Sequence, residues 1–285
     1  MLISLVLATV GRSEAVGRCL RSLAAQSDQN FEVLLIDQNS DDRLDIWVDE
    51  AQLLGLRLRH IRLKKPSLSG ARNIGIAESV GAVVGFPDDD CWYEASVISN
   101  LRNAFAGNEH LDGCVANWVE QSRARGEDAS GSTLSLAAWR KFRGGDASSI
   151  SLFFRRDLVL RLGGFDERIG VGQWFGAAEE TDLIFRALAS GACLQRWPAL
   201  RIHHVFGAFQ NAPLALQLRN ARSRARGTGA MYAKHRLTAY IVVRGLTAPV
   251  LIPLVCIRGW DVIVIGLYTS LGRLEGLVRW GWGRP

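Results

Sequence analysis

The sequence predicts an α/β fold: a mostly parallel sheet flanked by helices, followed by a helical C-terminal appendage. Over the first hundred residues, short aliphatic runs that are typical of buried strands alternate with helical patterns. This β-α-β-α order favours parallel strands covered by helices. After residue 213 the composition changes, and basic residues with long apolar runs replace the mixed pattern. We therefore expect a globular domain at residues 1–213 and a helical tail at residues 214–285.

The elements of the first half follow from these patterns in order. Four aliphatic runs predict strands at residues 3–8, 33–36, 56–61 and 82–86. Helical periodicity predicts a helix capped by Ser13, helices at residues 44–54 and 71–77, and a helix that carries Val97, Leu101 and Phe105. Ligands of parallel sheets bind beyond the carboxyl ends of the strands, so the residues after each strand are the first candidates for a site.

The second half mixes strands with helices and a loop. Strands are expected at residues 112–118, 151–154 and 200–202, and a polar surface loop at residues 120–132. A helix that begins near Arg156 should end at Gly163-Gly164. Residues 179–189 predict a further helix, with apolar side chains inward.

Three consecutive carboxylates, Asp88-Asp89-Asp90, follow the strand at residues 82–86. Adjacent carboxylates repel one another unless a cation or hydrogen-bond donors compensate them. At the carboxyl end of a strand they suit a hard divalent cation, which takes oxygen ligands and bridges phosphates. The alternative is a solvated acidic turn or a helix N-cap, because aspartate favours both.

A second acidic cluster, Glu179-Glu180-Thr181-Asp182, opens the helix at residues 179–189. Acids in a first helical turn ordinarily compensate the helix dipole. A carboxylate near a metal–diphosphate site also suits general-base catalysis, in which it takes the proton of an attacking hydroxyl group. The pair His203-His204 offers one further metal ligand, although a single histidine is usually structural.

Six segments in this order resemble the family 2 glycosyltransferases over residues 1–205. The segments are LVLATVGR (5–12), IDQNSDD (36–42), LSGARN (68–73), FPDDD (86–90), GGFDE (163–167) and EETDL (179–183). Each segment is a weak signal alone, and their order and spacing carry the resemblance. It implies a GT-A-like (Rossmann-like) fold.

The resemblance also implies a role for each matching residue. The pocket for the nucleobase and ribose would be lined by Ala8, Thr9, Asp37, Gln38 and Arg72, and Arg12 would also bind the donor. Asp88 and Asp89 would hold the ribose and the sugar, while Asp90 and His204 would bind Mg²⁺ or Mn²⁺ at the diphosphate. Glu180 would be the catalytic base, with Glu179 and Asp182 positioning it or binding sugar hydroxyls. We assign Asp166 and Trp174, the latter in a glycine-containing loop at residues 170–176, to the acceptor side.

Three positions depart from the family pattern. Gln38 stands where a second aspartate is common, which leaves uracil and thymine donors both open. Pro87 replaces an apolar residue. Glu180 stands where aspartate is more common, so the base would be one methylene longer and its assignment relative to Glu179 stays open.

The implied reaction is an inverting, metal-dependent transfer of a single sugar from a nucleotide-diphosphate sugar. The Q-x-x-R-W motif of processive members is not matched, because Gln195-Arg196-Trp197 lacks the two intervening residues. Two other classes remain open. One is a non-catalytic module that binds nucleotide sugars and scaffolds other enzymes. The other is a sugar nucleotidyltransferase, which would need a glycine-rich phosphate loop after the first strand.

The tail is strongly basic. Residues 215–285 carry eleven Lys/Arg against two acids, a net charge of +9, within a chain of net charge +6. This charge and the aliphatic runs favour an anionic membrane surface over nucleic acid as the partner. Neither apolar run, at residues 245–257 or 262–271, has the ~20 residues that a simple span needs. We expect helices that lie on the membrane or re-enter it, and the alternative is a helix pair that covers the domain or a dimer partner.

These features together predict where the protein works and on what. The expected acceptor is a lipid-linked saccharide at the cytoplasmic face of the bacterial inner membrane. The resemblance implies a role in exopolysaccharide, capsule or O-antigen assembly.

Overall fold

The computed structural model describes residues 1–122, 131–142, 148–204 and 212–282, and they form two compact units. The first unit contains residues 1–136, 144–164 and 186–206, and the strands of the sheet lie within it. The second unit contains residues 137–143, 165–185 and 207–285. The described part of the expected tail, residues 214–282, therefore belongs to one unit with two earlier segments of the chain.

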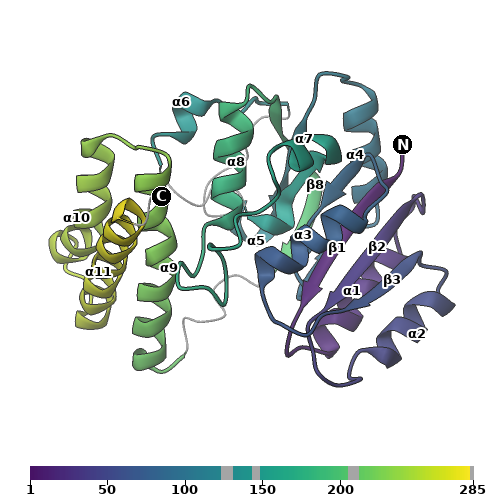
Figure 1. Cartoon of the computed structure of the whole chain (residues 1–285), viewed down its shortest axis with the longest axis horizontal. Helices are drawn as coiled ribbons and strands as arrows, with labels where there is room; N and C mark the ends of the chain where they lie inside the picture. Colours follow the sequence, from purple (N-terminus) through teal and green to yellow (C-terminus); the bar gives the residue numbers. More distant parts are fainter. Residues whose placement is uncertain (123–130, 143–147, 205–211, 283–285) are drawn as a thin grey trace. The chain divides into compact units, whose positions relative to one another are not determined.

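A mixed sheet organises the first unit (Figure 1). Its strand order in the described chain is β3-β2-β1-β4-β7-β6-β8-β5. The strands are β1 (Ile3–Thr9), β2 (Phe31–Asp37), β3 (Leu58–Arg62), β4 (Val83–Gly85), β5 (Cys91–Tyr93), β6 (Gly113–Trp118), β7 (Leu152–Arg155) and β8 (Leu194–His204).

The first four strands are parallel, as the sequence predicts, and the others mix both directions. β1 pairs in parallel with β2 and β4, and β2 with β3. β7 runs antiparallel to β4 and β6, β5 runs antiparallel to β8, and β6 pairs in parallel with β8. The carboxyl ends of β1, β2 and β4 therefore meet at one edge of the sheet, which is where the acidic run begins.

Helices cover the sheet and form most of the second unit. Their bounds are α1 (Glu14–Ala24), α2 (Asp45–Leu53), α3 (Leu68–Glu78), α4 (Val97–Ala106), α5 (Val119–Ser122), α6 (Leu136–Trp139), the 3-10 turn η1 (Ser149–Ser151), α7 (Arg156–Arg161), α8 (Glu179–Ala189), α9 (Leu214–Lys234), α10 (Ala239–Val255) and α11 (Trp260–Trp282). β1 is buried along its whole length. Alternate side chains of β1 join the core with α1, α2 and α4, and Val6 on the opposite face contacts α3 at Gly75.

The predicted elements are present, with three differences. Ser13 is the N-cap residue of α1, but its side chain makes no capping hydrogen bond. Instead its hydroxyl accepts from Trp47 Nε1 at 2.8 Å and donates to the Arg43 carbonyl. β5 was not predicted, because its three residues directly follow the acidic run. Residues 120–122 of the expected loop belong to α5, and residues 123–130 lie outside the described part of the chain.

The tail folds as three helices, of which α11 packs closely on α9 (Figure 1). None of the helices within the described residues has both the length and the apolar character needed to span a bilayer. Arg222 and Arg226, two of the eleven basic residues of the tail, pair with Glu275 of α11. The sequence did not predict this pairing, because Glu275 lies 53 and 49 residues after the two arginines.

Glycines let α9 and α11 approach to backbone contact. A Cβ atom added at Gly276 would lie 2.0 Å from the Arg226 carbonyl oxygen, and one at Gly272 would lie 2.3 Å from the Arg222 carbonyl oxygen. Real Cβ atoms do not occur at such distances, so any larger residue would push the helices apart. The glycines of α11 are therefore packing residues.

We expect Gly276→Ala to lower the free energy of unfolding by on the order of 1–3 kcal/mol, because the added methyl group overpacks the helix contact. The matched control is Gly281→Ala, also in α11, where an added Cβ meets nothing within 4 Å. Alanine favours helix over glycine by up to about 1 kcal/mol, so the control should be neutral or stabilising. Urea denaturation followed by circular dichroism measures both variants. Equal stability of the two would contradict the close packing.

Candidate functional site

The acidic run lies at the carboxyl edge of the sheet, beside the end of β1. An isolated parallel bridge joins Ala8 to Asp88. The three aspartates then point to different partners. Asp88 accepts from Arg72, a fully buried arginine, at 2.9 Å, and from Ser149 at 3.3 Å. Donors thus compensate the first carboxylate, as close-set acids require.

Asp89 turns toward the end of β1. Its carboxylate accepts from the Thr9 hydroxyl at 2.6 Å and from Arg12 Nη1 at 2.8 Å. Burial disfavours the charged form and raises the pKa of Asp89 to about 6, although the Thr9 hydrogen bond and the Arg12 charge oppose this change. Asp89 therefore gains a proton more readily than an aspartate in solvent does.

Asp90 turns the other way, toward β8. Its carboxylate lies 2.9 Å from His204 Nε2 and also pairs with Arg12. Burial opposes ionisation here too, but His204 and then Arg12 outweigh it and lower the pKa of Asp90 to about 2. Asp90 therefore stays ionised at all physiological pH values, as a metal ligand should.

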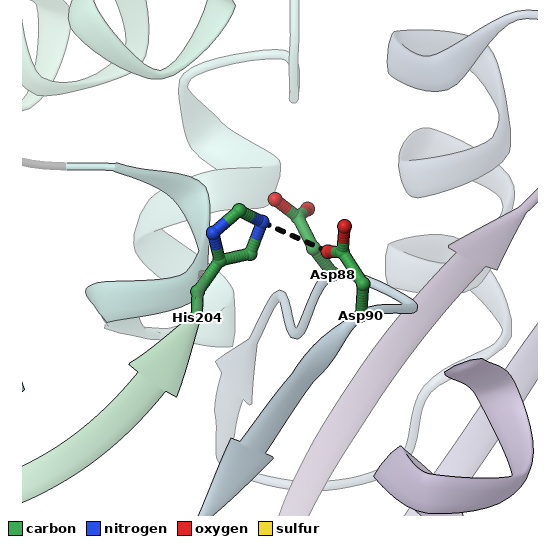
Figure 2. Close-up of side chains that lie close together, drawn as sticks. All are labelled: Asp88, Asp90 and His204. Carbon is green, nitrogen blue, oxygen red and sulfur yellow. Dashed lines mark ion pairs between the residues drawn. The ribbon is translucent and has the colours of Figure 1, made fainter. Parts of the chain in front are cut away.

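Asp88, Asp90 and His204 form a candidate metal centre. One ligand atom from each residue lies within 4.8 Å of the ligand atoms of the other two. Among the described residues, this is the cluster of His, Cys, Asp or Glu side chains that could hold a metal ion. Figure 2 shows the three side chains turned toward one another, with the His204–Asp90 ion pair marked. Two carboxylates and one imidazole suit Mn²⁺ well and Mg²⁺ in part, because Mg²⁺ prefers oxygen ligands alone. The donor set therefore fits the expected divalent cation and adds Asp88 to the two ligands that we predicted.

Neighbouring side chains hold His204 in place. The Trp118 ring packs edge-on against the His204 ring, with centroids 5.2 Å apart, and Trp118 Nε1 donates to the His204 carbonyl. The backbone amide of His204 donates to Glu120 at 3.1 Å. His203 lies between Glu94 and Glu120 instead, at 3.0 and 2.9 Å. His204, and not His203, is grouped with the aspartates.

The residues expected to line a nucleotide pocket meet at the same edge. Asp37, fully buried at the end of β2, pairs with His60 Nε2 at 2.9 Å and accepts from the Asn39 amide. Gln38 accepts from the Ser67 backbone amide at 2.6 Å and donates to the Thr9 carbonyl. These contacts tie β1, β2, β3 and the start of α3 together around the carboxyl ends of the strands.

The second acidic cluster forms the first turn of α8. This turn belongs to the second unit, which includes α8 as far as residue 185. Ala178, just before it, has φ 84°, a left-handed conformation that is uncommon for alanine. Strained backbone of this kind concentrates at functional sites. Glu179 is buried and Glu180 is partly exposed, so Glu180 has the better access to a substrate.

Asp182 is fully buried and is held by the C-terminal end of α9. Lys234 Nζ lies 2.8 Å from Asp182 Oδ1, and His235 Nε2 lies 2.9 Å from the same atom. The His235 ring also stacks on Phe185, with centroids 4.3 Å apart. This arrangement suits a positioning role for Asp182, because a carboxylate without exposed surface has no room for a sugar hydroxyl.

Asp166 and Trp174, the expected acceptor-side residues, lie in the second unit. Asp166 pairs with Lys234 at 2.6 Å and with Arg168 at 2.8 Å. Burial alone would raise the pKa of Asp166, but Arg168 and Lys234 outweigh it and hold this pKa well below its ordinary value. The guanidinium groups of Arg226 and Arg279 lie 4.6 and 4.2 Å from the centroid of the Trp174 ring. The acceptor role of both residues stays a prediction.

Several contributing residues were not predicted: His60, Glu94, Glu120, Ser149, Lys234 and His235. Each acts through a partner far away in the sequence. The parallel register does not pair His60 with Asp37, because it places His60 in the middle of β3 opposite Leu35 and Arg62 opposite Asp37. No local signal marks the others.

The pKa of Asp89 predicts a pH dependence of stability. Because its folded-state pKa of about 6 lies above the ordinary 3.8, the unfolded chain releases this proton first, and stability is lost as pH rises from about 3.8 to about 6. This gap corresponds to on the order of 3 kcal/mol. We expect Asp89→Asn to lose less stability than the parent between pH 4.5 and 7, measured by urea denaturation in EDTA. Parallel curves for the two proteins would show that Asp89 titrates normally.

Comparison with known proteins gives a family match and a fold match. Residues 4–162 match the family model described as Glycosyl transferase family 2. The uncharacterized glycosyltransferase EpsJ of Bacillus subtilis is 26% identical over 124 residues, which cover 44% of this chain and 36% of EpsJ. The chain thus matches well under two thirds of that relative's length.

Two solved structures share the fold. The mannosyltransferase PcManGT from Pyrobaculum calidifontis, in complex with GDP-Man and Mn²⁺, has a TM-score of 0.68 at 13% identity, covering 99% of this chain and 88% of PcManGT. TarS 1-349 of S. aureus, in complex with UDP-GlcNAc, has a TM-score of 0.57 at 15% identity, covering 96% of this chain and 92% of the other. At these identities the likeness shows the fold alone, and it confirms the predicted GT-A-like architecture.

Proposed function

This chain belongs to glycosyl transferase family 2, and on that premise we propose that it transfers one sugar from a nucleotide-diphosphate sugar to a hydroxyl group of a lipid-linked saccharide. One observation carries the proposal: Asp88, Asp90 and His204 converge at the carboxyl edge of the sheet. The fold matches support it, because PcManGT was solved with GDP-Man and Mn²⁺ and TarS with UDP-GlcNAc.

In this proposal Asp88, Asp90 and His204 hold Mg²⁺ or Mn²⁺ at the donor diphosphate. The cation would offset the negative charge on the departing diphosphate. Around it, Ala8, Thr9, Asp37, Gln38 and Arg72 bind the nucleoside, and Asp89 with Arg12 orients the sugar. The contacts that join β1 and β2 at this edge support a preorganised pocket, since they fix Gln38 and Asp37 before any ligand binds.

The proposed general base is Glu180. The acceptor oxygen forms a bond to the anomeric carbon while the bond from that carbon to the diphosphate oxygen breaks, and the acceptor proton passes to Glu180. A single displacement inverts the anomeric configuration. The partial exposure of Glu180 and the strained Ala178 before it support this assignment. Glu179 and Asp182 position the first turn of α8.

We place the acceptor at the cytoplasmic face of the inner membrane, in the assembly of a bacterial surface polysaccharide. Residues 1–213 would form the transfer domain, and residues 214–285 would keep the protein at the membrane. The net charge of +9 in the tail supports this division, because anionic lipid attracts basic segments.

Nucleotide release from a panel of nucleotide sugars tests the proposal. Purified protein with Mg²⁺ or Mn²⁺ should slowly hydrolyse one donor to free nucleoside diphosphate, and EDTA should stop the release. Pyrophosphate release would instead indicate a nucleotidyltransferase. No release from any donor, with donor binding intact, would indicate a non-catalytic module.

A further inference from the structure

The helices α10 and α11 expose an unusual amount of apolar surface. On α11, Leu267, Leu271, Leu274 and Val278 are exposed at intervals of four, three and four residues, which places them on one face of the helix. On α10 and the turn after it, the exposed large apolar residues are Tyr240, Val243, Leu251, Ile252, Leu254, Val255 and Ile257. Apolar patches of this extent mark interaction surfaces.

Charge is almost absent from this exposed apolar face. Among the exposed residues of the described α11 between 262 and 278, none carries a charge. The two charged residues in that stretch face the neighbouring helices: Arg273 donates to the Gly245 carbonyl, and Glu275 pairs with Arg226 at 2.7 Å. The face is therefore built to meet an apolar environment.

The position of the charges decides how the hairpin of α10 and α11 can enter that environment. Arg258 and Asp261 are exposed at the turn between the helices. Insertion of the turn into hydrocarbon would bury both charges, which is costly. If the helices instead lie parallel to an interface, these charges stay at one rim of the apolar face, with Arg236 and Arg279 near the other ends of the helices. Trp260, also exposed, then sits at interfacial depth, where tryptophan is enriched in membrane proteins.

We propose that α10 and α11 lie flat in the head-group region of an anionic lipid bilayer, with this face buried among the acyl chains. The exposed charges favour lipid over a second copy of the chain. Within residues 212–282 the exposed acid is Asp261, and the exposed bases are Arg219, Arg224, Arg236, Arg258 and Arg279. Anionic head groups complement these arginines. A second copy of the chain would bring the same excess of exposed arginines and no matching acids, so it complements these charges less well than anionic lipid does.

The biological role of this membrane contact rests on the proposed function, because a flat-lying hairpin would keep the enzyme beside a lipid-linked acceptor. Its physical basis is independent of catalysis. Vesicle binding requires no donor, and nucleotide release requires no vesicle. Failure of vesicle binding therefore leaves the proposed donor chemistry standing, and failure of nucleotide release leaves the proposed membrane contact standing.

Co-sedimentation with vesicles tests the proposal. We expect the full chain to bind vesicles of phosphatidylglycerol and phosphatidylcholine, and to bind pure phosphatidylcholine at least tenfold more weakly. The triple variant Leu267→Gln, Leu271→Gln, Leu274→Gln should lose at least tenfold in partitioning. These side chains are 41–48% exposed, so each glutamine can keep its amide group in solvent without entering the core. The matched control is Ile46→Gln, Leu53→Gln, Leu54→Gln in the first unit, where the exposed fractions are 54–88%; it should bind vesicles like the parent.

Two further measurements sharpen the outcome. Brominated lipids should quench Trp260 fluorescence, taken as the difference between the parent and Trp260→Phe, more strongly with bromine near the head groups than near the chain ends. The reverse order would overturn the flat orientation. Failure of the parent to bind anionic vesicles, or equal binding by the triple variant, would overturn the proposal. So would a dimer in light scattering that the triple variant dissociates, because the face would then belong to a second copy.

Discussion

Replacement of Glu180 by glutamine is expected to lower the rate of sugar transfer by a factor of about 10²–10⁴ while donor affinity stays within a few-fold of the parent. Glutamine keeps the size of the side chain and its hydrogen bonding but cannot take a proton at neutral pH. Since Glu180 is partly exposed, the substitution should not disturb the core. Single-turnover transfer and donor titration calorimetry measure the two quantities separately.

Glu179→Gln is the matched control, because the two glutamates are adjacent and differ in burial. If Glu180 is the base and Glu179 only positions it, Glu179→Gln should lose far less of the transfer rate than Glu180→Gln does. If only the Glu179 variant loses transfer, the base is Glu179 and the one-residue assignment is wrong. Full activity in both variants would remove the first turn of α8 from the chemistry.

Replacement of Asp90 by alanine is expected to remove the metal dependence of donor binding. In the parent, Mg²⁺ or Mn²⁺ should tighten donor binding by on the order of 100-fold, since even outer partners of metal ligands contribute 10–100-fold to metal affinity. In Asp90→Ala the ratio of donor Kd values without and with metal should fall close to one. Arg12 also pairs with Asp90, and loss of that carboxylate leaves the positive charge of Arg12 available to the diphosphate. The Kd ratio is therefore a better measurement than the affinity alone.

Asp89→Asn is the control for this prediction. Asp89 bonds to Thr9 and Arg12 and is not grouped with Asp88 and His204. Its variant should keep a large Kd ratio even if donor affinity falls. A parent whose donor affinity is indifferent to EDTA would show that the three side chains hold no catalytic cation.

The strands and helices that pattern alone determines were predictable. β1, β2 and β4 are short aliphatic runs buried in the sheet, and α8 has the predicted ends, because burial imposes a period on the sequence. β5 and the length of β8 were not predictable in this way. β5 is three residues long, and it exists because Cys91 pairs with His204, more than a hundred residues later. That pairing also brings Asp90 to His204. Local sequence patterns therefore predict neither β5 nor the Asp90–His204 contact, since both depend on the same long-range pairing.

The acidic motifs were predictable as chemistry, whereas their partners were not. A run of three aspartates at a strand end indicates a cation or donors, but it does not say which carboxylate turns where. In the fold, Arg72 and Ser149 lie beside Asp88, and Thr9 lies beside Asp89. The tail shows the same limit, because the basic periodicity of α9 does not reveal that Glu275 neutralises two of its arginines.

The contact of Lys234 and His235 with Asp182 has a consequence for how such chains diversify. The end of α9 supplies the cations for a buried carboxylate two positions after the proposed base. Loss of those partners would leave an uncompensated charge in the interior, a change that typically costs several kcal/mol. A tail exchanged between relatives would therefore have to bring this lysine–histidine pair with it. A chimera joined at residue 213, with a tail that lacks this pair, would leave Asp182 without its two partners and would therefore misplace helix α8.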